Sequence, residues 1–344
     1  MDPLRAAARG ERVEGLVDAA TLAAASAEGV TGLLAHLAVD PSRELLVMAA
    51  AIEAKSRYLA GELVRLVEAF RDANVPLLAL KGPVLSKQLY GDSTLRMIND
   101  IDVIVPFAQT RDAEELLRSL GYRDEVPMTA AQRDIKHRFH SGTPFRNEER
   151  GTTVDLHWRF GHVQFPIALD FDEVWRRCAE VEIGGVNVPT LGWTDLVIFT
   201  CSHAAKHFWS KLEMLAQVTA LSRSDAIDWP EVDRLAVAAR SARQVGLSFL
   251  IAHDVLGIEL PRLPRCLDLS RPKLERMRQR LQKVHEHDAG GRDLFMILDR
   301  RRDVLAAMAA AIFVPTHADW SAGSTGPSAW LLRPFRLAWQ RLRR

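Results

Sequence analysis

The run from Asn99 to Val105, Asn-Asp-Ile-Asp-Val-Ile-Val, limits the possible folds of this chain more than any other stretch. It is typical of a buried β-strand, yet it carries two carboxylates, Asp100 and Asp102, one residue apart. Because side chains alternate across a strand, both acids project from one face while Ile101 and Val103 point into packing. Two like charges on a core strand are costly unless a cation lies between them. The pattern indicates either a divalent metal with an anionic ligand or a strand end whose acids face water.

A second motif lies upstream, where the apolar run from Val75 to Leu80 leads directly into Lys81-Gly82-Pro83. Glycine after a strand lets the backbone approach a ligand, and proline suits the first turn of a helix. The predicted helix from Val84 to Tyr90 would present its N-terminal amides to an anion, with Lys81 as an added cation. Such junctions also occur without a phosphate role, so this motif counts mainly together with its neighbours.

A third motif is the predicted strand from Thr152 to Trp158, which follows a strand from Arg138 to Arg146 and a turn. Asp155 and His157 share one face of it. An acid at such a place is often an exposed residue on a half-solvated sheet. If this strand lies beside the strand of the paired acids, however, Asp155 delivers a third carboxylate to the same metal site.

Together the three motifs resemble the plan of the DNA polymerase beta-type nucleotidyltransferase superfamily, and in particular its bacterial group of uncharacterised "nucleotidyltransferase family" proteins. The matching stretches follow the expected order along nearly the whole chain: Leu80-Lys81-Gly82, Leu89 to Asp92, Arg96, Asp100 to Val105, Leu120-Gly121-Tyr122, Val154 to Trp158, His203 to Trp209 and Leu331 to Pro334. The resemblance implies an α+β fold, in which a small mixed β-sheet core is flanked by N-terminal helices and a C-terminal helical domain.

The resemblance also implies an Mg²⁺-dependent transfer of a nucleoside monophosphate from a nucleoside triphosphate, ATP by default, with release of pyrophosphate. The implied catalytic and metal-binding residues are Asp100, Asp102 and Asp155, and the implied nucleotide-binding residues are Lys81, Gly82, Pro83, Arg96, His203, Lys206 and His207. Two Mg²⁺ ions, with Mn²⁺ as the alternative, would bind the acids, one activating the acceptor hydroxyl and the other holding the β- and γ-phosphates. The acid of the third motif would take the acceptor's proton.

Three departures from the superfamily pattern stand out. Pro83 occupies the place of a usual second glycine or serine, which removes a backbone donor and a possible hydroxyl. A long gap before Asp100 leaves room for a loop from Gly91 to Asn99 that carries Arg96. Gln217 stands where the closer family often has an acid.

A long helix is predicted to begin at Thr194 and to run for about 27 residues. Its positions His203, Lys206 and His207 share one face. Zinc binding by the two histidines is disfavoured because no glutamate follows His203, and a solvated basic face is the other alternative. We expect this helix to pack across the cleft, so that these cations meet the triphosphate or the acceptor.

Four segments are predicted along the chain: an N-terminal helical segment (1–73), the α/β core (74–190), a helical domain (191–320) and a basic tail (321–344). Within them, periodicity predicts further helices over 22–37, 42–73, 110–120, 230–256, 271–287 and 295–313. Gly184-Gly185 is predicted to turn between two short strands.

The tail from Trp330 to Arg344 holds five arginines and no acids, interleaved with apolar residues. This composition suits a membrane-surface helix or contact with an anionic partner. Pro334 interrupts the pattern, so we favour a packed or peripheral tail. Residues 321–328 have the composition of a linker.

Composition points to a cytoplasmic enzyme. A formal charge of +1 exerts no whole-protein attraction for nucleic acid. Three cysteines suit neither a disulfide framework nor a zinc site, which favours a reducing compartment. The start has no secretion signal, and no apolar run reaches the ~18 residues needed to cross a bilayer.

The acceptor stays open at this level. A small molecule or a natural-product peptide or sugar fits the motifs, as does a protein or RNA modified by a toxin-like or regulatory enzyme. A non-catalytic nucleotide-binding module, disabled by Pro83, is a third alternative. No sequence fingerprint separates ATP from the other nucleotides.

Overall fold

The computed structural model describes residues 2–15, 17–281, 294–315 and 333. The helices in these residues are α1 (Pro3–Ala8), α2 (Ala19–Ala27), α3 (Thr31–Leu37), α4 (Arg43–Asp72), α5 (Pro83–Tyr90), the 3-10 helix η1 (Phe107–Gln109), α6 (Thr110–Ser119), α7 (Ala130–Phe139), α8 (Phe171–Arg176), α9 (Trp193–Lys206), α10 (Leu212–Ser222), α11 (Trp229–Ala238), α12 (Ala242–Leu256), α13 (Pro264–Leu281), α14 (Leu294–Ile297) and α15 (Arg301–Phe313). The strands are β1 (Leu78–Ala79), β2 (Ile101–Ile104), β3 (Arg123–Asp124), β4 (Gly142–Asn147), β5 (Thr152–His157), β6 (Ala179–Ile183) and β7 (Val186–Thr190).

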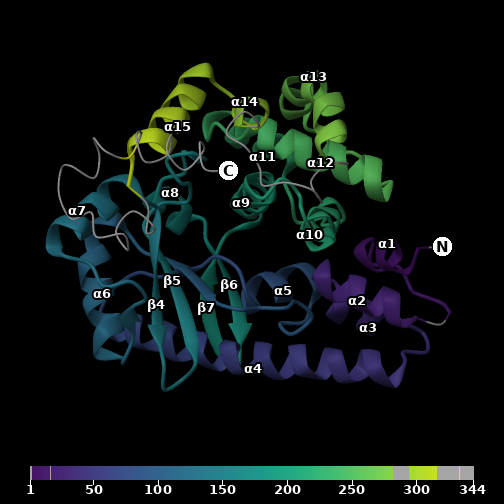
Figure 1. Cartoon of the computed structure of the whole chain (residues 1–344), viewed down its shortest axis with the longest axis horizontal. Coiled ribbons are helices and arrows are strands. Elements are labelled where there is room, and N and C mark those ends of the chain that lie inside the picture. The colour runs from purple at the N-terminus through teal and green to yellow at the C-terminus, as the bar shows by residue number, and fades with distance from the viewer. Residues whose placement is uncertain (1, 16, 282–293, 316–332, 334–344) are drawn as a thin grey trace.

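The strands form one mixed sheet of seven, in the order β3-β4-β5-β2-β1-β7-β6. Figure 1 shows β4 and β5 on one side of this sheet and β7 and β6 on the other. The acid-bearing strands β2 and β5 are neighbours and run parallel, while β1 runs antiparallel to β2. Helix α6 follows β2 and ends before Gly121, whose φ is +89°, as the sequence predicted. The predicted hairpin turns at 147–151 and at Gly184-Gly185 are also confirmed. The mixed α/β core is thus the one that the motifs led us to expect.

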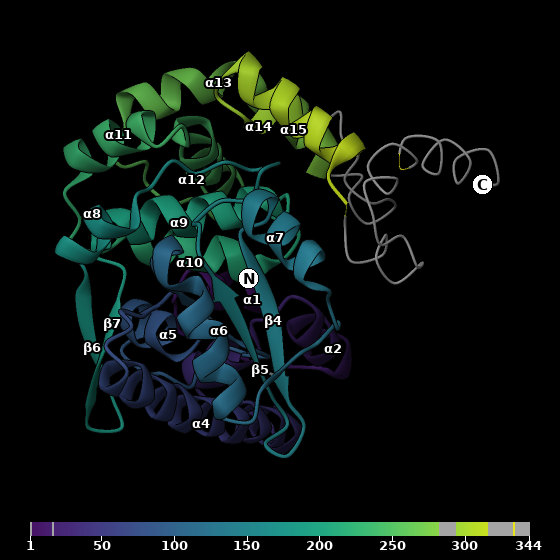
Figure 2. The ribbon, with the colours of Figure 1, turned by 90° about the vertical axis from the view of Figure 1, so that its left-hand side faces the viewer.

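One face of the sheet packs against α4 and α6 through apolar side chains. Alternate residues of β2 and β5, among them Val103 and Val154, join Leu66 and Phe70 of α4 and Leu117 of α6 in one buried cluster. Figure 2 shows α4 and α6 together on this side of the molecule. Because side chains alternate along a strand, every second residue of the acid-bearing strands faces this apolar layer.

The opposite face of the sheet meets the helical part of the chain. Leu78, Leu80 and Ile104 belong to a second buried cluster, formed mainly with α9, α10 and α12. These helices lie together above the sheet in Figure 2. Asp102, two residues before Ile104, therefore projects toward the helices and away from α4.

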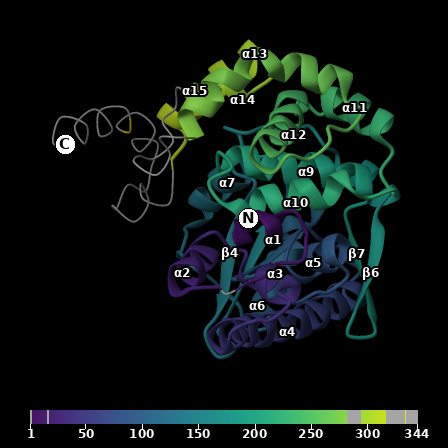
Figure 3. The ribbon, with the colours of Figure 1, turned by 90° about the vertical axis from the view of Figure 1, so that its right-hand side faces the viewer.

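The N-terminal region differs from prediction in one respect. The expected helix over 22–37 is two helices, α2 and α3, because the chain turns at Gly29 with φ +73°. A Cβ at Gly29 would lie 2.7 Å from Oε2 of Glu213, so the turn is also a close approach to α10. The amide of Leu212 donates to Glu28 at 2.7 Å, and α1 packs on α10 (Figure 3).

The long helix predicted from Thr194 was wrong in length and in its start. Gly192 precedes the first turn, and the helix ends at Lys206, where α10 takes over after a short break. Phe208 and Trp209 form this break with φ of +53° and +48°. Both side chains are buried, and the indole of Trp209 donates to Ser248 at 2.9 Å. Tertiary burial of two aromatic residues therefore overrides the local helical pattern.

Two other boundaries also differ. The predicted helix over 230–256 is divided into α11 and α12 at Arg240, whose φ is +60°, and Asp299 accepts hydrogen bonds from the first amides of α12. The strand predicted to begin at Arg138 begins at Gly142, because Thr129 opens helix α7 with a capping box. The helix over 295–313 is likewise divided, into α14 and α15.

The predicted linker (321–328) lies outside the described residues, as does the basic tail apart from Arg333, whose guanidinium donates to the carbonyl of Ala311. Residues 282–287 of the predicted helix over 271–287 lie outside them too. Cys178, Cys201 and Cys266 are free thiols. Within the described ranges, none of the helices combines the length and apolar character that crossing a membrane requires.

Candidate functional site

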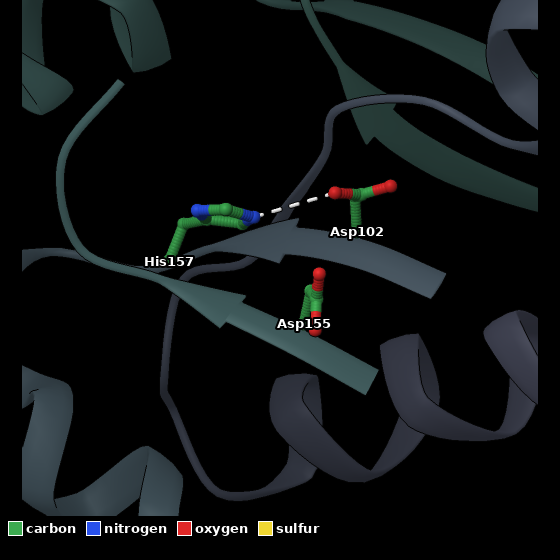
Figure 4. Close-up of side chains that lie close together, drawn as sticks. All are labelled: Asp102, Asp155 and His157. Atoms are coloured by element: carbon green, nitrogen blue, oxygen red, sulfur yellow. Dashed lines mark hydrogen bonds and ion pairs between the residues drawn. The ribbon is translucent and has the colours of Figure 1, made fainter. Parts of the chain in front are cut away.

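Strand register brings two of the three predicted carboxylates together. Asp102 on β2 and Asp155 on β5 are paired across the parallel ladder, so their side chains project from the same face. A carboxylate oxygen of each and one ring nitrogen of His157 all lie within 4.8 Å of one another (Figure 4). The three side chains converge from two adjacent strands onto one point above the sheet.

Asp102 is the most enclosed of the acids, with 5% of its surface exposed. Its Oδ1 lies 3.0 Å from Nζ of Lys81 and 3.3 Å from Nε2 of His157. Burial alone would raise the pKa of Asp102, but the Lys81 charge and the contact with His157 outweigh it and hold that pKa below its usual value. Asp102 is therefore ionised at neutral pH.

Asp100 and Asp155 show the opposite electrostatic behaviour. Burial raises the pKa of each carboxyl, and the negative charge of Asp102 raises both further. Among the described residues, no hydrogen bond or ion pair engages the Asp155 carboxylate. The site thus gathers more negative charge than its own lysine neutralises.

These acids open into a cavity of about 350 Å³ between the sheet and α9. Its lining comprises Lys81, Asp100, Asp102, Ser141, Asp155, His157, Phe160, Gly161, His162, Phe165, Ile167, Phe199, Ser202, His203, Lys206 and His207. The face of α9 that holds His203, Lys206 and His207 thus lines the same cavity as the acids, across from the sheet.

His203 of α9 and His207, which directly follows the helix, add no charge to this cavity at neutral pH. Burial lowers the pKa of His203 well below its usual value and, with the charge of Lys206, lowers the pKa of His207 to about 4. Their rings meet edge to face at 4.7 Å. Lys206 is the residue of this face that supplies positive charge, while burial and the charge of Lys81 lower its pKa from 10.5.

The glycine motif positions Lys81 beside Asp102. Gly82 has φ +70° and ψ −136°, a conformation open essentially to glycine alone, and Pro83 is the first residue of α5. This turn places Lys81 in the cavity lining, which includes neither Gly82 nor Pro83.

Arg96 lies elsewhere. Its Nε and Nη2 donate to Oε1 of Glu213 at 2.8 and 2.6 Å, and Gln217 donates to the same oxygen at 3.2 Å. The arginine joins the loop over 91–99 to α10 and does not line the cavity.

A family profile described as "Uncharacterised nucleotidyltransferase" matches residues 4–257. The chain belongs to this family. It is accordingly a transferase enzyme, as the sequence motifs had indicated. A search of curated proteins gives no match.

Solved structures offer weaker similarities. The solution structure of the antibiotic-resistance factor ANT(2'')-Ia is 19% identical, with a TM-score of 0.37 over 58% of this chain and 98% of that one. A crystal structure of ANT(2'')-Ia with adenylyl-2''-tobramycin is 16% identical, with a TM-score of 0.31 over 66% and 98%. The lincosamide antibiotic adenylyltransferase LnuA, bound to lincomycin, is 18% identical, with a TM-score of 0.31 over 47% and 96%. None of these identifies a substrate for this nucleotidyltransferase.

The donor set of the nucleotidyltransferase fits a divalent metal ion. Carboxylate oxygens suit Mg²⁺ and Mn²⁺, and imidazole is accepted by Mn²⁺ and softer ions. Asp102, Asp155 and His157 form the one group of three such ligands within the described part of the chain. Lys81 already pairs with Asp102, so an ion sharing this carboxylate would have to displace the ammonium or use the second oxygen.

Sequence reasoning missed several residues of this site. His157 had a detectable signal, because it follows Asp155 by two positions and so shares its strand face. The loop from Phe160 to Ile167 and the two serines of the cavity, Ser141 and Ser202, had none. They enter the lining through tertiary contacts alone.

Proposed function

We propose that this protein transfers a nucleoside monophosphate from a nucleoside triphosphate, ATP by default, to a hydroxyl or phosphate of an acceptor in an Mg²⁺-dependent reaction. The observation that carries the proposal is the β2–β5 register, which sets Asp102 and Asp155 side by side in a cavity. Family membership supplies the class of reaction. The reducing cytoplasm, which three free thiols suit, is the proposed compartment.

The proposed metal ligands are Asp102 and Asp155 with His157, and Asp100 contributes charge at the same cavity. Magnesium bound there would offset the crowded carboxylate charge and polarise the phosphate oxygens. The sequence had assigned all three aspartates to the metal. The position of His157 adds a fourth candidate ligand. An imidazole ligand would favour Mn²⁺ over Mg²⁺.

The proposed transfer forms one bond to the α-phosphorus of the nucleotide and breaks another. The acceptor oxygen forms a bond to the α-phosphorus, the bond from that phosphorus to the bridging oxygen breaks, and pyrophosphate leaves with the electron pair. Asp155 is the proposed recipient of the acceptor's proton, because its carboxylate lines the cavity with no hydrogen-bond partner among the described residues.

Two lysines are proposed to balance the triphosphate charge. Lys81 and Lys206 both line the cavity, one next to the glycine turn and one on α9. Lys81 is paired with Asp102, and we propose that it exchanges this carboxylate for a phosphate oxygen when nucleotide and metal bind. Gly82 and Pro83 act by holding Lys81 and the start of α5 in place.

The test is to incubate the protein with each of the four nucleotides and Mg²⁺ or Mn²⁺, and to measure pyrophosphate release and self-modification. We expect metal-dependent release that EDTA abolishes and that Asp155→Asn loses. Full release by Asp155→Asn would overturn the proposed role of that residue. Nucleotide binding without pyrophosphate release under any condition would favour the non-catalytic nucleotide-binding alternative.

A further inference from the structure

A second and larger cavity, of about 690 Å³, lies beside the proposed active site. It is bounded by η1, α7, α8 and the loop that follows β5, and its walls include five aromatic residues: Phe107, Phe139, Trp158, Phe160 and Phe171. Its volume falls within the range of about 300–1,000 Å³ that is usual for small-molecule sites. None of the proposed catalytic groups lies in its lining.

The two cavities share a wall. Phe160, Gly161, His162 and Ile167 line both of them. This wall is a tight loop, in which the amide of Phe165 donates to the carbonyl of His162 at 2.8 Å. A Cβ at Gly161 would lie 2.2 Å from the backbone nitrogen of Ile167, so the two ends of the loop are in contact. A molecule in the larger cavity would therefore lie one loop away from Asp102 and Asp155.

One charged group in the larger cavity, Arg159, is held in a fixed position by hydrogen bonds. Nη1 of Arg159 donates to the carbonyls of His137 and His140 at 2.7 and 2.8 Å, and the guanidinium lies 4.7 Å from the ring centre of Phe107. Among the described residues, no carboxylate pairs with it. Its Nε and Nη2 stay available to a ligand, in the fork geometry that matches a carboxylate.

The other titratable groups that face this cavity are less suited to binding a charged ligand. Asp170 caps α8 by accepting from the amide of Glu173, and Asp172 is exposed in the same first turn, where water screens it. Arg138 is exposed as well. His140 bonds to the carbonyl of Pro315, and burial lowers its pKa, as it lowers the pKa of His162 to about 4. Both imidazoles are uncharged at neutral pH, so Arg159 is the main partly buried charged group among the described residues that line this cavity.

We propose that this larger cavity binds the acceptor, and that the acceptor is a small molecule with a flat apolar ring system and a carboxylate that Arg159 recognises. The inference rests on the proposed function, and it supplies the acceptor class that the site itself leaves open. Ring stacking on the aromatic walls would position the molecule, and the arginine would set its orientation. A hydroxyl elsewhere on the ligand would then point past the shared loop toward Asp155.

Two matched probes test the charge preference. 3-(2-Naphthyl)-lactate carries the ring, the hydroxyl and the carboxylate, and its primary amide differs only in charge. Their binding to the full-length protein is followed by naphthyl fluorescence without nucleotide, so the result does not depend on whether transfer occurs. We expect the acid to bind at least tenfold more tightly than the amide, and Arg159→Gln to remove that preference. Equal binding of acid and amide to the unmodified protein would overturn the proposal.

A second pair of variants tests the place of binding even if Arg159→Gln fails to fold. Ala108 is exposed and lines the larger cavity, whereas Ala131 is exposed and lines neither cavity. Ala108→Trp should weaken both probes at least tenfold, and Ala131→Trp should leave them unchanged. Unchanged affinity in Ala108→Trp, or displacement of the acid probe by ATP with Mg²⁺, would overturn the assignment of this cavity. Probe binding that persists in Asp155→Asn would separate this result from a failure of the transferase proposal.

Discussion

The two faces of the central sheet are built from the same strands, but one forms the apolar core and the other lines the proposed active site. Toward α4 and α6, residues such as Val103 and Val154 are fully buried in apolar packing. Toward α9, Asp102 and Asp155, their immediate neighbours in the chain, line a charged cavity. The alternation of a strand thus lets one segment carry both stability and chemistry, with only a one-residue offset between them.

The charged face also costs stability. Burial and like charge both oppose ionisation of Asp100 and Asp155, which means that these acids oppose folding at neutral pH. The apolar face carries no such cost. We therefore expect substitutions on the two faces to separate cleanly into effects on catalysis and effects on stability.

The largest effect is expected on the charged face. Asp155→Asn should lower the transfer rate by about 10³-fold, because general-base catalysis contributes roughly 10² to 10⁴. Its free energy of unfolding should stay equal or rise, since a repelled charge is removed. Pyrophosphate release and urea denaturation measure the two quantities. Asp40→Asn, at an exposed position, is the control. A marked loss of stability in Asp155→Asn would show that the charged face also stabilises the fold.

The apolar face should respond in the opposite way. Leu66→Ala on α4 removes a fully buried side chain and should lower the free energy of unfolding by about 2–5 kcal/mol. The Leu66→Ala molecules that remain folded should keep the transfer rate of the unmodified protein. Glu68→Ala, exposed on the same helix, should change stability by no more than about 0.5 kcal/mol. If Leu66→Ala instead lost activity at full stability, the two faces would not be independent.

A buried polar contact between α6 and α7 gives a pH-dependent effect. Burial alone would raise the pKa of Glu114, but the hydrogen bond from His137, the charge of Arg133 and the hydrogen bond from Arg118 reverse this and lower it from 4.5. The carboxylate therefore stabilises the fold fully above pH 4.5, and the contribution is lost as pH falls through the lower folded-state value.

Accordingly, Glu114→Gln should lower the free energy of unfolding by about 1–3 kcal/mol at pH 7. The gap to the unmodified protein should close as the pH falls below 4.5, as denaturation curves at pH 7 and pH 3 would show. Glu115→Gln, next to it in sequence, serves as the control. A gap that stayed constant with pH would contradict the ionised state of Glu114.

The smallest effect concerns the glycine turn beside Lys81. Gly82→Ala meets no steric obstacle closer than 3.7 Å, but alanine at φ +70° costs about 1–2 kcal/mol. Because Gly82 positions Lys81, activity should fall together with stability. Gly61→Ala provides a matched control in α4, where open space and helical geometry should make alanine stabilising by about 0.5–1 kcal/mol. Equal shifts in melting temperature for the two variants would show that the positive φ at Gly82 imposes no strain on alanine.

Local patterns predicted most of the sheet and the helices that cover its apolar face. The alternation at 99–105, the start of α5 at Pro83 and the end of α6 before Gly121 all follow from short-range rules. The same rules failed where the chain turns at Gly29, Phe208 and Arg240. At Gly29 the glycine itself was a local stop signal that the helical periodicity outweighed. At Phe208, burial of the aromatic side chain against distant helices decides the backbone, and the local pattern gives no sign of it.

The amino-acid order by itself determined that Asp100 and Asp102 share a face and that Asp155 lies on a comparable strand, because side-chain direction follows from strand periodicity. Only the tertiary structure decided that β5 pairs with β2 in the register that joins Asp102 to Asp155. It also decided that Lys81 and His157 contact the same carboxylate, and that Arg96 bonds to Glu213 instead of lining the cavity. Distances between segments depend on the packing of whole helices and strands, and periodicity within one segment carries no information about them.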